Sequence, residues 1–463
     1  MLQAISRFFK EANRKHFFSV LSVFLFYAIS RLFLIWRYGD IAFGYDTGIY
    51  RFNINAYWDK FGQTDLPPFA FSWFSNFFKL LGFSTDMVMF GVYFATACAM
   101  FWLLYLLVKK YFDHSVALWT VFLFTISIVQ FEFYQWYYYR SFVAITLLLF
   151  TLLLFSYYSY FSLLPLILAT CFHPLSAMPI ILMIIAMISI DKEHRRYWLV
   201  LFGITSICSC AINWSAFYEH YLFLKSNRWL AGNDNFGSTE STGQFISLMF
   251  FLRAMFIYGL FSIIGIITNI KKNKIFPLIA FFSLVAMLFR IMFYRRLFIW
   301  LDLILIIYAG VFLSNLTNKF FNQKIMKLAI FVFCLIGLAN ISRFIYLKSP
   351  ILSNSEFYAI YNSDNLRESE YVLSFSNKYS PWLYGYTNKK VIAPGMFEYN
   401  KWNYEEWTVF WYGKDRDKII ELLNRYPTPI YIYLNNDDEY WLGNFENSQF
   451  IKKIYDHWYI FGK

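Results

Sequence analysis

Long apolar runs recur along the chain up to about residue 346, separated by short polar linkers. A helix needs roughly 20 apolar residues to cross a bilayer, and most of these runs approach that length. The runs lie near residues 17–36, 88–108, 116–131, 142–156, 162–173, 175–190, 197–213, 245–268, 275–292, 297–315 and 328–346. We therefore expect a polytopic α-helical membrane protein with about eleven spans.

The pair of runs at 162–190 is interrupted by Phe172-His173-Pro174. Proline disfavours a helical residue before it and removes a hydrogen bond from a helix interior, so we expect a break there. Each half is short. The pair is therefore either two spans or a hairpin that dips into the membrane and lines a cavity in the protein.

Composition agrees with a membrane protein and shows where the positive charge lies. Of the 463 residues, 59% are apolar and 15% are charged, against about 25% charged residues in soluble domains. Residues 1–347 carry 28 Lys and Arg against 14 Asp and Glu, whereas residues 348–463 carry 13 against 15. Since the net charge of +12 belongs to the membrane part, membrane topology explains it and no nucleic-acid partner is expected.

If the eleven runs cross the membrane alternately, four of the five linkers on the N-terminal side are basic. Basic linkers mark the cytoplasmic side. The five linkers are Lys109-Lys110, residues 156–161, Lys192/Arg195/Arg196, Lys271/Lys272/Lys274 and Lys319/Lys324/Lys327. This pattern places the N-terminus in the cytoplasm and residues 348–463 outside it. We expect the plasma membrane of a bacterium or archaeon.

Two parts follow from this pattern: a transmembrane domain at 1–347 and a soluble extracytoplasmic domain at 348–463. The aromatic-rich first outer loop, residues 38–87, predicts helices that lie along the membrane interface. A helical pattern at 415–425 and a strand pattern at 429–434 predict a small α/β fold for the second domain. All five cysteines lie in apolar runs without metal-ligand spacing, so we expect them to fill apolar space.

The predicted topology places several ionisable residues on the outer face of the membrane. The topology itself rests on the apolar runs and the basic linkers, so these residues did not enter its derivation. Asp46 lies in a Gly-flanked segment after the first span and could be a general base, or only a helix cap. Glu132 emerges with the third span and could join Asp46 or pair with Arg140. His173, at the outer end of the broken pair, is either a ligand-binding or a structural residue.

Three arginines on the outer side, Arg290, Arg295 and Arg296, run against the positive-inside trend. Arginine binds phosphate through a planar, permanently charged fork. A cluster at headgroup depth therefore suits a phosphate carried on a lipid, with snorkelling toward ordinary headgroups as the alternative. Asp302 could orient Arg295 from the same helix face, and Arg31 could pair with a carboxylate of the same cavity.

With these residues, the chain resembles the GT-C superfamily of membrane glycosyltransferases. The segment Asp46-Thr-Gly-Ile-Tyr50-Arg51 is similar to the Asp-x-x-Tyr-x-x-Arg segment of oligosaccharyltransferase catalytic subunits, with Arg one place early. Tyr294-Arg295-Arg296 is similar to their phosphate-binding Arg region. Ser380-Pro381-Trp382-Leu383-Tyr384-Gly385-Tyr386 is similar to their Trp-Trp-Asp-Tyr-Gly acceptor motif, although the second Trp and the Asp are absent.

The resemblance implies a GT-C-like fold and inverting transfer of a sugar from a polyprenyl-phosphate donor to a glycan, lipid or protein acceptor. Asp46 and Glu132 would be the catalytic carboxylates, and Arg290, Arg295 and Arg296 would bind the donor phosphate. The residues expected to contact substrate are Tyr50, Arg51, Arg140, His173, Trp382 and Tyr384.

The sequence leaves two other functions open. An oligosaccharide polymerase or ligase with a lipid-diphosphate donor is the first alternative, and a lipid-linked sugar flippase is the second. No cofactor is assigned, and Mg²⁺ or Mn²⁺ stays open if Asp46 and Glu132 converge on one ion. Membrane lipids are expected partners in every case.

Overall fold

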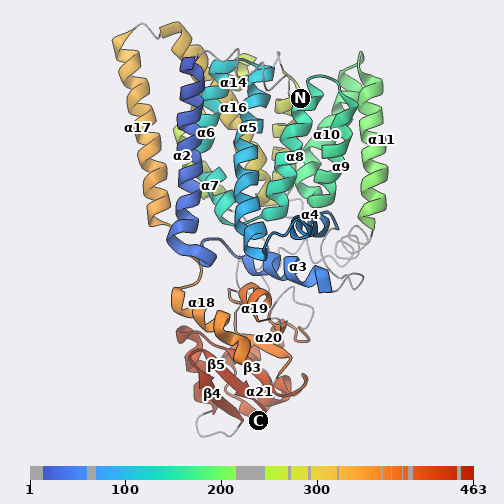
Figure 1. Ribbon diagram of the computed structural model, residues 1–463, viewed down its shortest axis with the longest axis vertical. Coiled ribbons are helices and arrows are strands. Elements are labelled where there is room, and N and C mark those ends of the chain that lie inside the picture. The colour runs from blue at the N-terminus through green and yellow to red at the C-terminus, as the bar shows by residue number, and fades with distance from the viewer. Residues whose placement is uncertain are drawn as a thin grey trace.

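The computed structural model consists of a helical bundle with a smaller part containing a β-sheet at one end (Figure 1). The structure describes residues 14–59, 69–214, 246–269, 273–289, 294–320, 323–366, 369–376, 378–387, 389–394, 400–445 and 450–462. A single large apolar cluster forms the core of the bundle. Two further clusters lie in the smaller part.

The helices of the bundle correspond to the apolar runs of the sequence. In chain order they are α2 (Arg14–Tyr38), α5 (Tyr93–Tyr111), α6 (His114–Ile126), α7 (Ile128–Gln135), α8 (Tyr139–Phe155), α9 (Leu163–Phe172), α10 (Pro174–Ile190), α11 (Arg195–Ile212), α13 (Leu248–Ala254), α14 (Phe256–Asn269), α15 (Ile275–Leu288), α16 (Phe298–Phe320) and α17 (Lys324–Leu347). Shorter helical segments are η1 (Gly39–Ile41), the π-helix η2 (Met87–Val92), η3 (Tyr160–Ser162) and η4 (Tyr294–Leu297).

Among the described residues, four helices are long and apolar enough to cross a membrane. Two bent pairs, α6 with α7 and α13 with α14, raise this number to six if each pair is one span. The remaining apolar helices of 10–17 residues are shorter than a typical span. The chain is an integral membrane protein, and the count of eleven spans stays a prediction.

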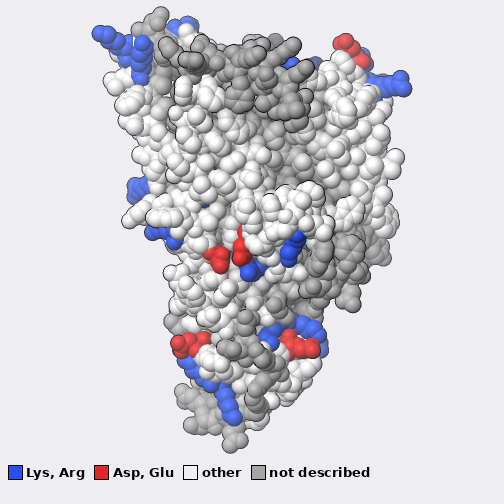
Figure 2. Space-filling view, in the orientation of Figure 1, with Lys and Arg blue, Asp and Glu red and all other residues white. Residues whose placement is uncertain are grey.

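The surface of the bundle agrees with this assignment. On the face shown in Figure 2, uncharged side chains cover most of the bundle, and Lys and Arg lie at its end farther from the sheet as well as nearer to and within the smaller part. Basic residues lie at helix ends on the side farther from the sheet. Lys109 and Lys110 are in the last turn of α5, and Lys324 is the first residue of α17 (Figure 1).

The predicted break at Pro174 is confirmed. α9 ends at Phe172, and His173 takes an extended conformation with φ −157° and ψ 92° before α10 begins. Its side chain accepts a hydrogen bond from the backbone N–H of Ser176 and so caps α10. Proline at the first helical position has no N–H to satisfy, so it fits the start of this helix.

A second break, between α6 and α7, bends the chain by 57° without proline or glycine. Ser127 is extended and caps α7 by accepting from the backbone N–H of Gln130. The buried Arg31 of α2 donates to the Thr125 carbonyl at the end of α6 at 3.5 Å, where a positive charge favours the helix C-terminus. Arg31 also donates to Ser30 and lies 3.9 Å from the Tyr27 ring centroid, so the expectation of a carboxylate partner for it is wrong.

Two helices, α3 (Thr47–Asp59) and α4 (Phe69–Leu80), follow the first long helix and lie across the end of the bundle (Figure 1). They belong to the segment for which the aromatic pattern predicted interfacial helices. α3 occupies the level between the bundle and the smaller part, so its N-terminus lies at the boundary of the two.

The smaller part is a five-stranded sheet with helices on both faces. Its strands, in the order β2-β1-β3-β5-β4, are β1 (Tyr371–Ser374), β2 (Lys390–Ile392), β3 (Ile430–Tyr433), β4 (Ile451–Tyr455) and β5 (Trp458–Phe461). β1 is parallel to β2 and β3, and β5 is antiparallel to β3 and β4. The helices are α18 (Asn354–Tyr361), η5 (Asn362–Asn365), α19 (Ser380–Tyr386), α20 (Tyr404–Tyr412), α21 (Arg416–Leu423) and η6 (Asn436–Phe445).

Alternate strand residues point to opposite faces of this sheet. Ile430 and Ile432 pack in one apolar cluster with residues of α20 and α21, and Tyr431 and Tyr433 pack in the other with residues of α18 and α19. The predicted strand at 429–434 and helix at 415–425 are thus present.

The two parts meet through a close crossing of α3 and α19. A Cβ on Gly48 would lie 1.9 Å from the Pro381 carbonyl oxygen, and one on Gly385 would lie 2.2 Å from the Gly48 carbonyl oxygen. Only glycine permits backbones to approach this closely. Nearby, Arg37 donates to the Tyr346 carbonyl at 2.7 Å and Tyr38 to the Lys348 carbonyl at 2.6 Å, so the chain entering the smaller part is held to the end of α2.

Candidate functional site

Asp46 lies at the N-terminus of α3, directly beneath the end of the bundle. The turn before it is fixed, because the Gly44 N–H donates to the Gln135 carbonyl at 2.9 Å and Thr47 Oγ1 donates to the Gly44 carbonyl at 2.6 Å. A Cβ on Gly44 would lie 2.9 Å from the Cα of Trp136. The segment that carries Asp46 therefore packs tightly against the turn between α7 and α8.

Two arginines act on the Asp46 carboxyl. Burial raises its pKa above the ordinary value, and the positive charges of Arg296 and Arg140 offset part of that rise. Within the described part of the chain, no hydrogen bond or ion pair engages this carboxyl. Asp46 is therefore a carboxylate held near two positive charges without being bonded to either.

Arg296 brings three elements together. Its Nη1 lies 3.3 Å from Nε2 of His173 at the start of α10, and its guanidinium lies 4.5 Å from the ring centroid of Tyr138. Trp300, about one helical turn later, donates its indole N–H to the Ser176 carbonyl at 2.8 Å and so holds the start of α16, which follows η4, against α10. The structure therefore joins the predicted residues Arg296 and His173, which are 123 positions apart in the sequence.

Glu132 is held by a residue that the sequence did not indicate. Its Oε1 accepts from Lys348 Nζ at 2.5 Å, and the carboxylate is almost fully buried. The pairing with Arg140 considered from sequence is not formed. Arg140 instead donates its backbone N–H to the Tyr50 hydroxyl at 3.3 Å, and its side-chain charge acts on Asp46.

Tyr138 is a site residue that sequence reasoning missed. Burial raises the pKa of its hydroxyl, the charge of Arg296 lowers it, and the charges of Asp46 and Glu132 raise it. Tyr138 therefore lies within the electrostatic reach of both predicted carboxylates, and its ring packs against the arginine. The only signal in the sequence was the run of aromatic residues at 136–139 next to Arg140.

The turn that carries Tyr138 is fixed by its neighbours. Tyr137 has a positive φ of 64°, a conformation that costs energy for a non-glycine residue. Its hydroxyl donates to the Met89 carbonyl at 2.7 Å, and the Tyr139 hydroxyl donates to the Val88 carbonyl at 2.7 Å. Both acceptors lie in the π-helix η2, so these hydrogen bonds hold the turn rigidly against the start of the α5 helix.

Other predicted substrate residues lie at the junction of the two parts. Arg51 forms an ion pair of 2.5 Å with Asp86 and lies 4.4 Å from the Tyr386 ring centroid. Trp382 is fully buried and stacks with Tyr386. Tyr384 packs on Phe52 at a centroid distance of 3.8 Å. These residues join α3 to α19, and their roles in substrate binding stay predictions.

The arginine cluster is only partly described. Arg290 lies outside the described residues. Arg295 precedes Arg296 in η4, and its guanidinium lies 6.0 Å from the Tyr294 ring centroid. Asp302 does not orient Arg295, because its carboxylate accepts hydrogen bonds from Ser127 and Gln130, each at 2.8 Å, and from the Tyr258 hydroxyl.

The described residues do not fit a metal ion at this site. No group of three or more His, Cys, Asp and Glu side chains comes together among them. The carboxylate of Glu132 is directed to Lys348, so it does not converge with Asp46 on one position.

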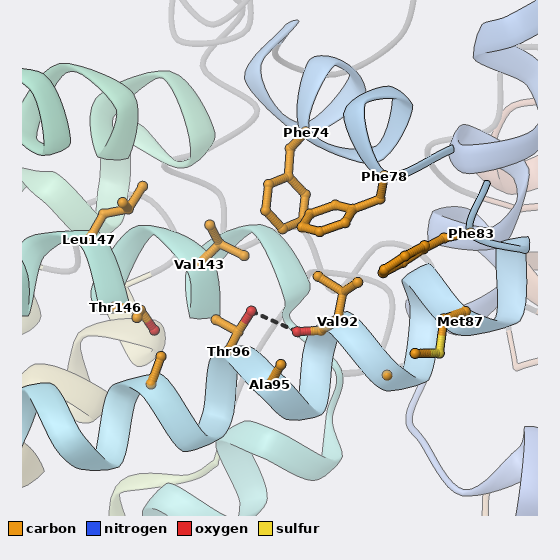
Figure 3. Close-up of a pocket in the computed structure, with 12 residues that line it drawn as sticks. Phe74, Phe78, Phe83, Met87, Val92, Ala95, Thr96, Val143, Thr146 and Leu147 are labelled. Atoms are coloured by element: carbon orange, nitrogen blue, oxygen red, sulfur yellow. Dashed lines mark hydrogen bonds between the residues drawn. The ribbon is translucent and has the colours of Figure 1, made fainter. Parts of the chain in front are cut away.

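An apolar groove of about 390 Å³ lies between α4, α5 with η2, and α8. In Figure 3, Phe74, Phe78 and Phe83 line one side, opposite Val92, Thr96 and Val143. The Thr96 hydroxyl donates to the Val92 carbonyl at 2.8 Å, so it is satisfied within its own helix. The Phe74 ring also contacts Tyr139, the residue before Arg140, which brings the groove close to the charged cluster.

Solved structures share this architecture. The oligosaccharyltransferase of Archaeoglobus fulgidus tethered to an acceptor peptide with an NVT sequon matches with a TM-score of 0.65 at 12% identity, over 92% of this chain and 69% of that one. The same archaeal enzyme, AglB, in complex with an inhibitory peptide and a dolichol-phosphate matches with a TM-score of 0.61 at 13% identity, over 92% and 70%. No protein-family model and no curated protein sequence matches the chain.

The chain thus shares its fold with the oligosaccharyltransferase of Archaeoglobus fulgidus, the kind of protein that the sequence resembles. At 12–13% identity the relationship is distant and concerns the fold.

Proposed function

We propose that this protein is a GT-C-type glycosyltransferase that moves a sugar from a polyprenyl-phosphate donor to an acceptor outside the cytoplasm. One observation carries the proposal: the Asp46 carboxylate lies within the electrostatic reach of Arg296 and Arg140, and Arg296 contacts His173. A carboxylate facing a cationic cluster combines a proton acceptor with a site for an anionic leaving group.

In the proposed reaction, an acceptor hydroxyl or amide attacks the anomeric carbon of the donor sugar. Its proton passes to the Asp46 carboxylate, the bond from the sugar to the phosphate oxygen breaks, and the polyprenyl phosphate leaves. Arg296 stabilises the charge that develops on that phosphate. One displacement inverts the anomeric centre. The groove beside Phe74 offers an apolar surface of the kind that the hydrocarbon chain of the donor requires.

A second candidate has support from the fold. The solved structures that the chain matches are oligosaccharyltransferases. The donor could accordingly be an oligosaccharide on a lipid diphosphate, transferred whole by the same residues. Purified protein given both donor classes separates the candidates, because only one class should yield product at micromolar concentration.

The proposed orientation places α3, α19 and the site outside the cytoplasm. Basic residues at the opposite end of the bundle support it. In a variant without native cysteines, a cysteine at Asp417, which is exposed on α21, should react with an impermeant reagent in intact cells. A cysteine at the exposed Lys274 should react only after permeabilisation. The opposite pattern would overturn the orientation.

The decisive experiment measures donor kinetics of Arg296 variants. Arg296→Ala should weaken donor use by roughly tenfold to several hundredfold, since charge-assisted hydrogen bonds contribute about 1.5–3 kcal/mol each. Arg296→Lys should recover part of the loss, because an ammonium group cannot reproduce the planar fork. The acceptor KM should change little.

The matched control is Arg343→Ala, which removes an exposed arginine from α17. It should leave donor kinetics unchanged. Wild-type donor kinetics in Arg296→Ala would contradict the proposed phosphate site.

A further inference from the structure

The apolar groove beside α4 runs inward from the end of the bundle that carries the site. The turn before α8 is hydrogen-bonded to η2, so α5 and α8 both begin at that end. The α8 residues that line the groove begin at Val143 and end at Leu147. Its α5 side reaches from Val92 to Ala99, about 10 Å at the 1.5 Å rise of a helix. In Figure 3 the Phe74 ring projects from α4 toward Val92 and Val143. The groove therefore extends along two helices of the bundle, away from the site.

The lining of the groove suits one hydrocarbon chain. Its polar side chains, Thr96 and Thr146, donate to carbonyls of their own helices at 2.8 and 2.9 Å, so neither needs a polar ligand. Ala95 and Ala99 are four residues apart on one face of α5, and both are exposed, so the groove is open along them. At roughly 30 Å³ for a group the size of a water molecule, the volume of about 390 Å³ holds about 13 such groups. That number corresponds to a single chain of about two to three isoprene units.

The end of the groove nearest the site is positively charged. Arg140 precedes Val143 by three residues and so shares its face of α8. Nε of Arg140 is shielded from water and has no hydrogen-bond partner among the described residues. The charge of Arg140 acts on Asp46, as does that of Arg296, so the groove begins one helical turn from the proposed phosphate site. An apolar groove that ends at positive charge is complementary to an amphiphile with an anionic head and one apolar chain.

We propose that this groove binds the isoprenoid units of the donor that lie nearest its phosphate, and that Ala95 and Ala99 provide the space for them. The inference rests on the proposed function and names the residues that recognise the lipid of the donor. An ordinary membrane phospholipid carries two chains, and the groove has room for one. A polyprenyl phosphate carries a single chain, so it places its phosphate near Arg140 and its first units along α5 and α8.

The test is binding of two phosphates of different chain length to the full chain in detergent. Farnesyl phosphate has three isoprene units, and dimethylallyl phosphate has one, which is too short to reach Ala99. Ala99→Leu fills the far part of the groove and should weaken binding of farnesyl phosphate by roughly tenfold to a hundredfold, the usual range when a packed site is overfilled. Binding of dimethylallyl phosphate should stay within about twofold of wild type, because its contacts are unchanged.

The variants are chosen to keep the helix intact. Leucine is a good helix former and the groove is open, so Ala99→Leu should keep the wild-type midpoint of thermal unfolding. Ala95→Leu, one turn nearer the site, is the second variant and should also weaken binding of farnesyl phosphate. The matched control is Ala211→Leu, which makes the same substitution at an exposed position of α11, outside the groove. It should bind both phosphates like wild type.

The outcomes separate the groove from the proposed function. If both groove variants bind farnesyl phosphate like wild type while Arg296→Ala binds both phosphates more weakly, the prenyl groove is wrong and the proposed function stands. If Arg296→Ala binds both phosphates like wild type, the proposed function and the prenyl groove fail together. Dilauroyl phosphatidate, an anionic lipid with two chains, should compete at least about tenfold more weakly than farnesyl phosphate. Equal competition would show that the groove holds ordinary membrane lipid and would overturn the proposal.

Discussion

Two carboxylates of the described chain, Asp302 and Asp46, lie in contrasting surroundings. Asp302, in the middle of the bundle, accepts hydrogen bonds from Ser127, Gln130 and Tyr258. Asp46, at the end of the bundle, faces Arg296 and Arg140, and no group of the described chain hydrogen-bonds it. Asp302 belongs to α16 and accepts from residues at the start of α7, whereas Asp46 directly precedes α3.

The difference shows what each carboxylate can do. Three donors fix the Asp302 oxygens, so this side chain stabilises the α6–α7 break. Asp46 has no such donors among the described residues, and the charges of Arg296 and Arg140 favour the anionic form that accepts a proton, although burial raises its pKa. Burial alone would assign the two residues the same role, and the hydrogen bonds distinguish them.

The largest expected effect is on activity at Asp46. Asp46→Asn should lower kcat by about 10²–10⁴-fold, the usual loss when a general base is removed, with no decrease in the midpoint of thermal unfolding. The matched control is Asp86→Asn in the same region, because the Asp86 carboxylate is exposed and bonded to Arg51. It should retain near wild-type turnover. Normal turnover in Asp46→Asn would transfer the proposed role to another group.

The next effect is on stability at Asp302. Asp302→Ala would remove the shared acceptor of Ser127, Gln130 and Tyr258, and each buried group left unsatisfied costs about 1–3 kcal/mol. We expect a clearly lower midpoint of thermal unfolding in detergent, with Asp302→Asn intermediate because its amide oxygen still accepts. The folded fraction should keep kcat within about tenfold of wild type. A stable but inactive Asp302→Asn would show that the comparison assigns the wrong role to this residue.

The smallest effect concerns pH. Burial raises the pKa of Asp46 and the charge of Arg140 lowers it, so removing that charge should raise the pKa further. Since the base must be ionised, the acid limb of kcat/KM in Arg140→Gln should move to higher pH, by about one unit or less. Arg51→Gln is the control, because the charge of Arg51 does not act on Asp46. An acid limb that moves to lower pH would contradict the electrostatic assignment.

Local signals in the sequence predicted the features that depend on neighbouring residues. Pro174 marked the break between α9 and α10, and the alternation at 429–434 marked β3. The position of Asp46 after the first apolar run predicted its place at the end of the bundle. Each of these signals acts within a few residues of the feature that it predicts.

The contacts that complete the site depend on packing between distant segments. Lys348 meets Glu132 across 216 positions, and Arg296 meets His173 across 123. The bend at Ser127 has no proline or glycine to mark it, and its ends are satisfied by Arg31 and Asp302 from two other helices. Such pairings follow from which helices are neighbours, and apolar periodicity does not determine that.

The crossing of Gly48 and Gly385 bears on how proteins of this fold can be recombined. Because a single added methyl group at either glycine would collide with the opposite backbone, α3 and α19 form a matched pair. A chimera that exchanges only residues 348–463 with another member of the fold should misassemble, whereas one that also exchanges residues 38–59 should fold. The two segments that must be exchanged together, residues 38–59 and 348–463, are therefore far apart in the sequence. The yield of folded protein from the two chimeras would test this directly.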